Sequence, residues 1–462
     1  MTKSQSDKTK NLKPFIIGAI GILLVVGFNA YSRTETSNRS ISIERAVLNN
    51  GMEIIVIPYD RAPTLTHMIW YKIGGADEPK GQSGIAHLFE HLMFKATKNR
   101  PAGEFSKTVA ALGGQDNAMT MADFTAYYQR IPKQHLETVI AMEADRMVNL
   151  RLSADDFETE KRVVLEERSL RVDTRPQALA NEKIRTRLYQ NHPYGIPVIG
   201  WRDEVENMPY QAAKIFYDNY YAPQQALMVV VGDTHLDEVV GFAKKHFGII
   251  PASQAQRPKR PAIDFLKPLK DLDPVVFEDA RLQQFIWQQL TRITPLSTEN
   301  KREMLALDMG IHILGGGSNS RLYRRLIRQD KTANYVAADI NILGINAFEV
   351  SVFAVAENDT QRYRMEAAIK EEIEQMRQIL PTNAEISRAV SALAADELYA
   401  MDGQASMAFN FGFNLALGND LDDLNDYPKL LSDISGQEIQ QAMNKHIRSD
   451  QSVIAHLMPK TQ

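Results

Sequence analysis

The chain of 462 residues contains no cysteine. This absence excludes disulfides, catalytic thiolates and cysteine-ligated zinc, so any metal must be held by histidine, aspartate or glutamate. It is compatible with an oxidising compartment without proving one. An excess of basic residues is also missing, because the formal net charge is −4. The net charge therefore gives no reason to expect a nucleic-acid partner.

Extremes of composition are absent as well, since 44% of the residues are hydrophobic and 24% are charged. These values are typical of a folded globular chain rather than a disordered or fibrous one. A length of 462 residues exceeds one ordinary domain and favours two of about 200 residues each. The proline-rich stretch 251–274 is the best linker candidate. We expect one domain at 43–262, a linker at 263–273 and a second domain at 274–462.

The longest apolar run lies near the N-terminus, where residues 15–28 carry no charge. It follows a basic segment that contains Lys3, Lys8, Lys10 and Lys13. This order predicts a signal anchor and polar tether over residues 1–42, with the chain attached to the inner membrane and its body in the periplasm. Phe28 fits a cleavage site poorly. A cleaved signal, which would export the body, and a buried core helix stay open as alternatives.

Strand and helix patterns are mixed along the body, so the expected fold class is α+β. Asn49, Asn50 and Gly51 separate two β-rich runs and predict a hairpin. A helix is expected to begin with Ser83 as its N-cap. Further patterns predict helices at 103–114, 135–150 and 153–172 and strands at 66–74, 117–131 and 226–233.

The second half repeats this organisation. It begins with strand-like residues 274–279, continues with a helix at 300–317 and ends in a strand at 452–459 that resembles 226–233. The pattern indicates a diverged internal duplication. The helix of the second half contains Met304, Asp308 and His312 but lacks the paired histidines found in the first half, so only the first half is expected to bind a metal.

Those paired histidines are His87 and His91, with Glu90 between them. On a helix, residues four apart share a face and lie about 6 Å apart along the axis, so two imidazoles can converge on one ion. A carboxylate on the same face can take a proton from a metal-bound water. The motif His-x-x-Glu-His is the inverzincin signature. The alternative is an amphipathic helix with one core histidine and one surface pair.

A catalytic zinc needs a third protein ligand and an open position. The helix at 153–172 offers Glu158, Glu160, Glu166 and Glu167. Spacing alone does not choose among them, and such carboxylates also fit a solvated helix face.

Together with a glutamate 76 residues after His91, the motif resembles the insulinase/pitrilysin family of zinc metallopeptidases. The segments 74–97, 113–128, 192–200 and 216–233 are similar to further family landmarks. The resemblance implies a half-length member with one Zn²⁺ per chain, Glu167 as the third ligand and Glu160 as its supporting acid. It also implies two related αβ domains of a half-clamshell, each a mixed antiparallel sheet with helices on one face.

The same resemblance assigns substrate-binding residues. It places Asn117 and Ala118 beside the scissile bond, on an edge strand that follows Gly113 and Gly114. Adding a peptide to such an edge would hold it extended through main-chain hydrogen bonds. Without the resemblance, Asn117 would fit a turn residue equally well.

An arginine and a tyrosine seven residues apart complete the family pattern in the second half, and Arg328 and Tyr335 match them. The resemblance implies that Arg328 holds a substrate carbonyl and that Tyr335 donates to the oxyanion. Arg321 and Tyr323 have the wrong spacing. From the residues alone, Arg328 and Tyr335 would be assigned to the surface. The segment also has Lys-Thr-Ala-Asn where the family has a glycine-containing turn.

The resulting hypothesis is a zinc-dependent endopeptidase that acts on peptides or unfolded polypeptides, with Glu90 as general base. The resemblance further implies a homodimer or a heterodimer with a related subunit. The alternative hypothesis is a non-catalytic scaffold or binding subunit. His192 is interpreted as a structural loop histidine rather than a fourth ligand.

Overall fold

The computed structural model describes residues 41–295, 297, 299–342, 344–419 and 427–460. The described residues all belong to one compact unit. The predicted anchor and tether fall almost wholly on residues 1–40, outside the described ranges. Within those ranges, no helix combines the length and hydropathy that crossing a membrane requires.

The first half of the body contains a six-stranded mixed sheet in the order β1-β2-β6-β3-β5-β4. Strand β2 pairs in parallel with β6, and the other neighbours are antiparallel. The predicted hairpin is confirmed, with Gly51 at φ 88° in the turn. The strands are β1 (Glu44–Val47), β2 (Glu53–Pro58), β3 (Thr64–Tyr71), β4 (Gln115–Thr120), β5 (Thr125–Pro132) and β6 (Ala226–Gly232).

The second half contains a five-stranded sheet in the order β7-β11-β8-β10-β9. Its strands are β7 (Val275–Asp279), β8 (Ile286–Ile293), β9 (Ala333–Ile342), β10 (Phe348–Ala356) and β11 (Ser452–Pro459). Its single parallel pair joins the first strand, β7, to the last, β11, and corresponds to the pair β2 and β6 of the first sheet. Apart from β1, the two sheets have the same strand order, so the predicted duplication is confirmed at the level of topology.

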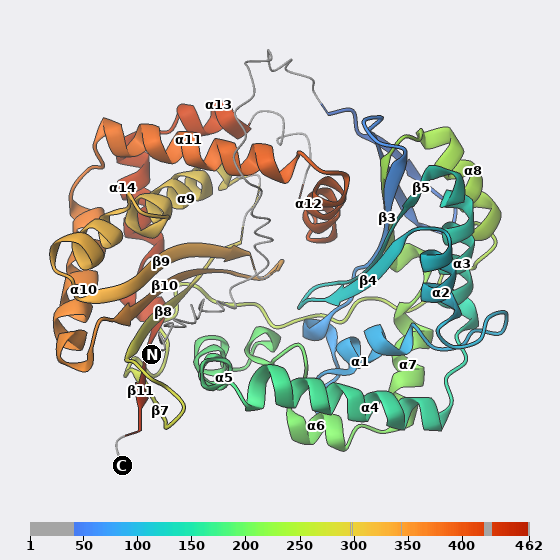
Figure 1. Cartoon of the computed structure of the whole chain (residues 1–462), viewed down its shortest axis with the longest axis horizontal. Coiled ribbons are helices and arrows are strands. Elements are labelled where there is room, and N and C mark those ends of the chain that lie inside the picture. The colour runs from blue at the N-terminus through green and yellow to red at the C-terminus, as the bar shows by residue number, and fades with distance from the viewer. Residues whose placement is uncertain (1–40, 296, 298, 343, 420–426, 461–462) are drawn as a thin grey trace, which may run out of the picture. The chain divides into compact units, whose positions relative to one another are not determined.

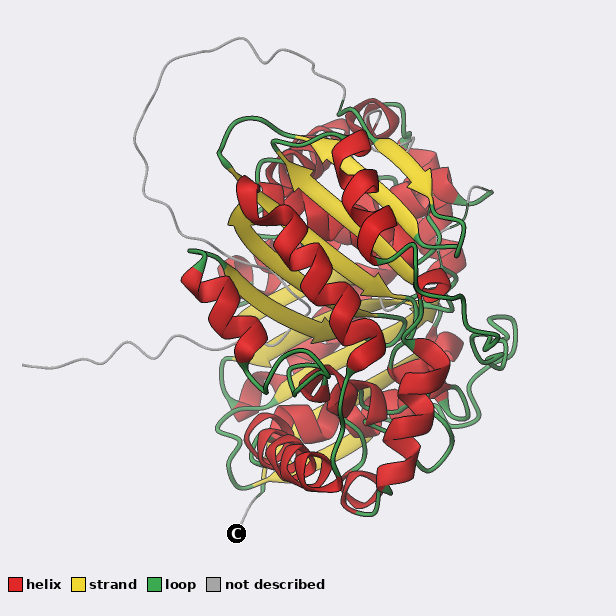
Figure 2. Cartoon of the chain, turned by 90° about the vertical axis from the view of Figure 1, so that its right-hand side faces the viewer, coloured by secondary structure: helices red, strands yellow, loops and turns green. Residues whose placement is uncertain are grey.

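Apart from α5 and α12, the helices of each half pack on one face of the sheet of that half, where its main apolar core lies (Figures 1 and 2). Those of the first half are α1 (Ile85–Leu92), α2 (Glu104–Ala111), α3 (Leu136–Asn149), α4 (Ala154–Arg168), α5 (Pro176–Tyr189), α6 (Arg202–Glu206), α7 (Tyr210–Tyr220) and α8 (Leu236–His246). Those of the second half are α9 (Lys301–Gly315), α10 (Arg362–Gln378), α11 (Asn383–Ala400), α12 (Gln404–Ala416), α13 (Tyr427–Ser432) and α14 (Gly436–His446). The chain is therefore an α+β protein.

Two of these helices cross between the halves. Helix α12 packs against β3 and β6 of the first sheet, on the face opposite α3 and α8 (Figure 1). Gly412 permits the contact, because a Cβ there would lie 2.2 Å from the ring of Trp70. Helix α5 packs reciprocally against β7, β8 and β11 of the second sheet. The exchange ties the two halves together, and it was not predicted from the sequence.

Candidate metal centre

Helix α1 carries the paired histidines and is anchored by its apolar face. Ile85, Ala86, Leu88, Phe89 and Leu92 are buried in the first core. The ring of Phe89 stacks on Tyr217 at 5.5 Å and contacts Tyr221 at 4.7 Å. This packing turns the opposite face, with the two histidines and Glu90, toward α4, which α1 contacts directly.

The predicted N-cap of α1 is wrong. The cap position is Gly84, in the left-handed region at φ 87°, and the helix starts at Ile85. The hydroxyl of Ser83 accepts a hydrogen bond from the N–H of Trp201 instead. Two N–H groups at the start of the helix are satisfied by Glu78, whose carboxylate accepts from Gly84 and Ala86 at 2.9 Å each. A carboxylate at a helix N-terminus also complements the helix dipole.

Glycine is required at two points where the start of α1 meets the loop 192–200. A Cβ on Gly84 would lie 2.6 Å from the carbonyl oxygen of Ile199, and one on Gly200 would lie 2.4 Å from that of Ser83. Both glycines also have positive φ. Two segments that resemble family landmarks thus contact each other through their backbones.

Helix α4 supplies the acidic side chains. Ser153 caps its N-terminus with a hydroxyl that accepts the N–H of Asp156 at 3.0 Å. Its buried apolar residues, Phe157 and Val164, fix which side faces the core. Of its four candidate glutamates, Glu160 and Glu167 turn toward α1, whereas Glu158 and Glu166 are exposed.

The side chains of His87, His91 and Glu167 converge, with one ligand atom of each lying within 4.8 Å of the others. Oε2 of Glu167 lies 3.7 Å from Nε2 of His87 and 3.3 Å from Nε2 of His91. Ligands about 2.1 Å from a tetrahedral zinc would stand about 3.4 Å apart, so this donor set fits the ion. Among the described residues, it is the sole cluster of three such side chains this close together.

The outer nitrogen of His91 is held by a further carboxylate. Nδ1 of His91 lies 3.3 Å from Oε2 of Glu160, and Oε1 of Glu160 lies 2.5 Å from Nζ of Lys95. Such a partner fixes the orientation of a metal-binding imidazole and the nitrogen it presents. Glu160 therefore occupies the supporting position that the resemblance implies. Lys95, one turn beyond His91, was missed because no spacing rule marks it.

The two histidines differ in charge. Burial, together with the nearby charge of His91, lowers the pKa of His87 to about 4, so its ring is neutral and in the metal-binding form. Burial opposes protonation of His91 too, but hydrogen bonds to Glu160 and Glu167 outweigh it and raise that pKa to about 9. The hydrogen bond from His91 is also the largest cause of the lowered pKa of Glu167. The cluster thus favours positive charge, as a cation site must.

Glu90 lies beside the ligands and is held from the neighbouring sheet. Its Oε2 accepts a hydrogen bond of 2.5 Å from the hydroxyl of Thr120, the last residue of β4. Burial raises the pKa of Glu90, and the Thr120 bond opposes that rise. Thr120 was not singled out from the sequence, although it stands three residues after Asn117.

Strand β4 lies at the edge of the first sheet, as the glycines before it predict. Asn117 and Ala118 pair with Tyr128 and Tyr127 of β5, and the side chain of Asn117 is exposed. The N–H of Ala118 donates to the side-chain oxygen of Asn117 at 2.8 Å.

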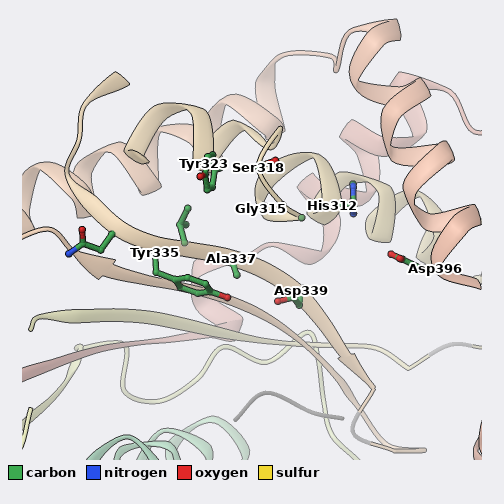
Figure 3. Close-up of a pocket in the computed structure, with 12 residues that line it drawn as sticks. His312, Gly315, Ser318, Tyr323, Tyr335, Ala337, Asp339 and Asp396 are labelled. Carbon is green, nitrogen blue, oxygen red and sulfur yellow. The ribbon is translucent and has the colours of Figure 1, made fainter. Parts of the chain in front are cut away.

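Arg328 and Tyr335 lie in the second half. Arg328 is exposed on a π-helical turn, η6 (Tyr323–Gln329), and its guanidinium stacks 5.5 Å from the ring of Tyr323. Tyr335 lies on β9, the edge strand, and contacts Phe353 at 5.9 Å. Tyr335 lines a cavity of about 430 Å³ together with His312, Asp339 and Asp396. Figure 3 shows these four side chains. The structure thus places the pair on elements of the second half, Arg328 on η6 and Tyr335 on β9, whereas the ligand helices belong to the first half.

His192 is buried in the loop after α5, where its Nδ1 accepts the N–H of Tyr194 at 3.2 Å. This contact fits its interpretation as a structural histidine.

Two family models match the chain in succession. The model described as insulinase (peptidase family M16) matches residues 54–201, and the model described as peptidase M16 inactive domain matches residues 207–393. The first match contains the metal cluster, and the second covers most of the second half.

Similar proteins extend the match over nearly the whole chain. A zinc protease from Helicobacter pylori, PqqE, is 28% identical over 96% of this chain and 98% of its own. A crystal structure of a protease from the same organism is 26% identical, with a TM-score of 0.82 over 91% of this chain and 100% of its own. The periplasmic protease PqqL from Escherichia coli shares the fold at 18% identity, with a TM-score of 0.77 over 91% of this chain and 48% of its own.

Proposed function

The chain belongs to the insulinase family of peptidases, M16, and from this membership we propose that it is a zinc-dependent endopeptidase that cleaves peptides or unfolded polypeptides. The observation that carries the proposal is the convergence of His87, His91 and Glu167 on one point, with Glu90 on the same helix face. Relatives that match the chain are named zinc proteases, which supports the same reading.

His87, His91 and Glu167 would hold one zinc ion per chain. A bound zinc would act as a Lewis acid and bring the pKa of a water molecule near neutrality. The protein contributes the remaining chemistry. Glu160 holds His91 in orientation through Nδ1, so that Nε2 is presented to the ligand position.

Glu90 is proposed as the general base. Its carboxylate is one residue from a ligand, and Thr120 holds one oxygen while the other can accept the proton of the attacking water. A base with a raised pKa can also return that proton to the departing amine. Both proton transfers use the carboxylate of Glu90, which is ionised again at the end of each cycle.

The substrate is proposed to add to the free edge of β4. Main-chain groups there would pair with an extended peptide, and Asn117 and Ala118 would lie beside the scissile bond. Because β4 ends at Thr120, the same strand that binds the peptide also holds the base. Arg328 and Tyr335 would contribute a carbonyl contact and an oxyanion donor from the second half.

Two copies of the chain, or this chain and a related subunit, are proposed to form the complete enzyme. The PqqL chain is about twice as long as the region it shares with this protein, so a single chain corresponds to one half of it.

The basic and apolar residues of segment 1–42 support a tether to the inner membrane with the body in the periplasm. Membrane fractionation and the mass of the purified body in solution test these two points.

Peptide hydrolysis after chelation tests the function. Purified protein treated with a chelator should lose cleavage of a quenched unfolded peptide, and one equivalent of zinc should restore it. Hydrolysis that persists in fully metal-free protein would reject the proposal.

A further inference from the structure

Four charged side chains join the proline-rich stretch 251–274 to the rest of the first half. Asp77 and Asp123 have no exposed side-chain surface, the side chain of Arg260 is 5% exposed and that of Arg257 is 22% exposed. Arg257 donates to both oxygens of Asp77 at 3.0 Å each and to the carbonyl oxygen of Asp123 at 2.8 Å. Arg260 donates to Asp77 at 3.0 Å and to Asp123. We call these four residues the charge joint. Its two negative and two positive charges compensate each other, and only Arg257 has appreciable access to water.

The charge joint is continuous with the start of α1. Asp77 ends the 3₁₀ turn η1 (Gly75–Asp77), and the next residue, Glu78, caps α1. Asp77 also accepts the N–H of Gly74 at 3.0 Å. Any movement of Asp77 therefore moves the carboxylate that fixes the first turn of the histidine helix.

The joint also holds the end of β4. The N–H groups of Gly75 and Ala76 donate to the carbonyls of Met121 and Ala122 at 3.0 and 2.7 Å. A Cβ on Gly74 would lie 2.4 Å from the Met121 carbonyl, so no side chain fits between the two segments. Met121 follows Thr120, which holds Glu90.

The second half meets the joint through the connection between β9 and β10. Asp123 accepts the hydroxyl of Tyr194 at 2.5 Å and the N–H of Ile345 at 3.1 Å. Arg260 donates to the side chain of Asn346 at 3.1 Å. Gly344 lies so close that a Cβ would overlap the Asp123 carboxylate. Strand β9, which carries Tyr335, thus leads directly to the joint.

We propose that Arg257 and Arg260 are positioning residues. Through Asp77 and Asp123 they hold the histidine helix, the β4 edge and the β9–β10 connection in one fixed arrangement. This inference rests on the proposed function insofar as it concerns hydrolysis. The ligand side chains lie further along α1 and on α4, so zinc binding persists when the joint is loosened, whereas peptide placement suffers.

Arg260→Met tests the inference, with Arg321→Met as the matched control. Arg321 pairs with Glu385 in the second half, and their side chains are 10% and 8% exposed, so the control removes a similarly buried charge. Hydrogen exchange of residues 84–92 and 115–124 is measured on the zinc-loaded full chain. Arg260→Met should accelerate exchange there by about tenfold or more while keeping one zinc, and Arg321→Met should not. Equal acceleration in both variants, or none in Arg260→Met, would overturn the inference.

Kinetics supply the second readout. Arg260→Met should raise KM for an unfolded peptide by about tenfold to a hundredfold and change kcat much less, and Arg260→Lys should recover part of the loss. If the wild type hydrolyses no peptide but the two variants differ in exchange as predicted, the proposed function is rejected and the inference about the charge joint stands.

If Arg260→Met does not fold, Asp123→Asn replaces it. That change keeps acceptors for Tyr194 and Ile345 but removes one charge, and an exchange pattern identical to wild type would count against the joint.

Discussion

The hydroxyl of Thr120, at the end of the edge strand β4, donates a hydrogen bond of 2.5 Å to the carboxylate of Glu90 on α1. The strand proposed to bind substrate and the residue proposed as base are therefore linked by one side chain. Removing the hydroxyl should free the carboxylate to leave its reactive position.

Thr120→Val should lower kcat/KM by about tenfold to a hundredfold, because a misplaced base loses much of its effect. Thr120→Ser, which keeps the hydroxyl, should retain most activity, and both variants should bind one zinc. Loss of zinc by Thr120→Val would show that the strand holds the metal site itself rather than its base.

Substitutions of three glutamates of α4 should weaken zinc binding to different degrees. Glu167→Ala removes a ligand and should weaken binding by more than about a hundredfold, whereas Glu160→Gln removes a supporting partner and should cost about tenfold to a hundredfold. Glu166→Ala, on the exposed side of the same helix, should change nothing. Chelator competition measures all three. Equal affinities for the Glu167 and Glu166 variants would move the third ligand elsewhere.

Tyr335→Phe should reduce kcat by about a hundredfold if its hydroxyl meets the developing oxyanion, since one such donor typically contributes that much. Tyr323→Phe is the control, because it keeps the ring that stacks on Arg328 and loses only a hydroxyl. Similar single-turnover rates for the two variants would remove Tyr335 from the proposed mechanism.

His192 should make the fold sensitive to acid. Burial, with the positive charge of Arg260 nearby, lowers its pKa from the usual 6.5 to about 4. Between these values the unfolded chain binds a proton that the folded chain does not, so stability falls as the pH drops from about 6.5 toward 4. His192 should account for about 2 kcal/mol of the stability lost between pH 7.5 and 5.

His192→Asn keeps an acceptor for the N–H of Tyr194 but does not titrate. Denaturant unfolding at the two pH values should show a loss smaller by about that amount in the variant. The same pH dependence in both proteins would mean that His192 is protonated in the folded chain.

Most strands and helices were predictable because their signals are local. The turn residues at 49–51, the apolar run at 226–232 and the periodic helices each encode their own structure. The failed N-cap shows the limit of that reasoning. Ser83 is a good cap by residue type, but Gly84 is fixed in a left-handed conformation by contact with Ile199, and Glu78 supplies the cap. A local rule does not include either contact.

The residues of the candidate site also fall into those that the sequence predicts and those that it does not. His87, Glu90 and His91 are three positions of one helix, and Glu167 follows from the family pattern. Lys95, Thr120 and the charge joint depend on which elements meet in space, and the exchange of α5 and α12 between the halves depends on it too. Contacts between residues that lie in different elements, far apart in the chain, leave no periodicity in a single sequence.

The most direct test of the central claim measures zinc content and peptide cleavage on the same samples of wild type and Glu90→Gln. We predict one zinc per chain in both proteins, cleavage by wild type, and a loss of about a hundredfold to ten-thousandfold in kcat in the variant. Normal cleavage by zinc-loaded Glu90→Gln would contradict the role of Glu90. A zinc-loaded wild type that cleaves no peptide would instead favour a binding subunit.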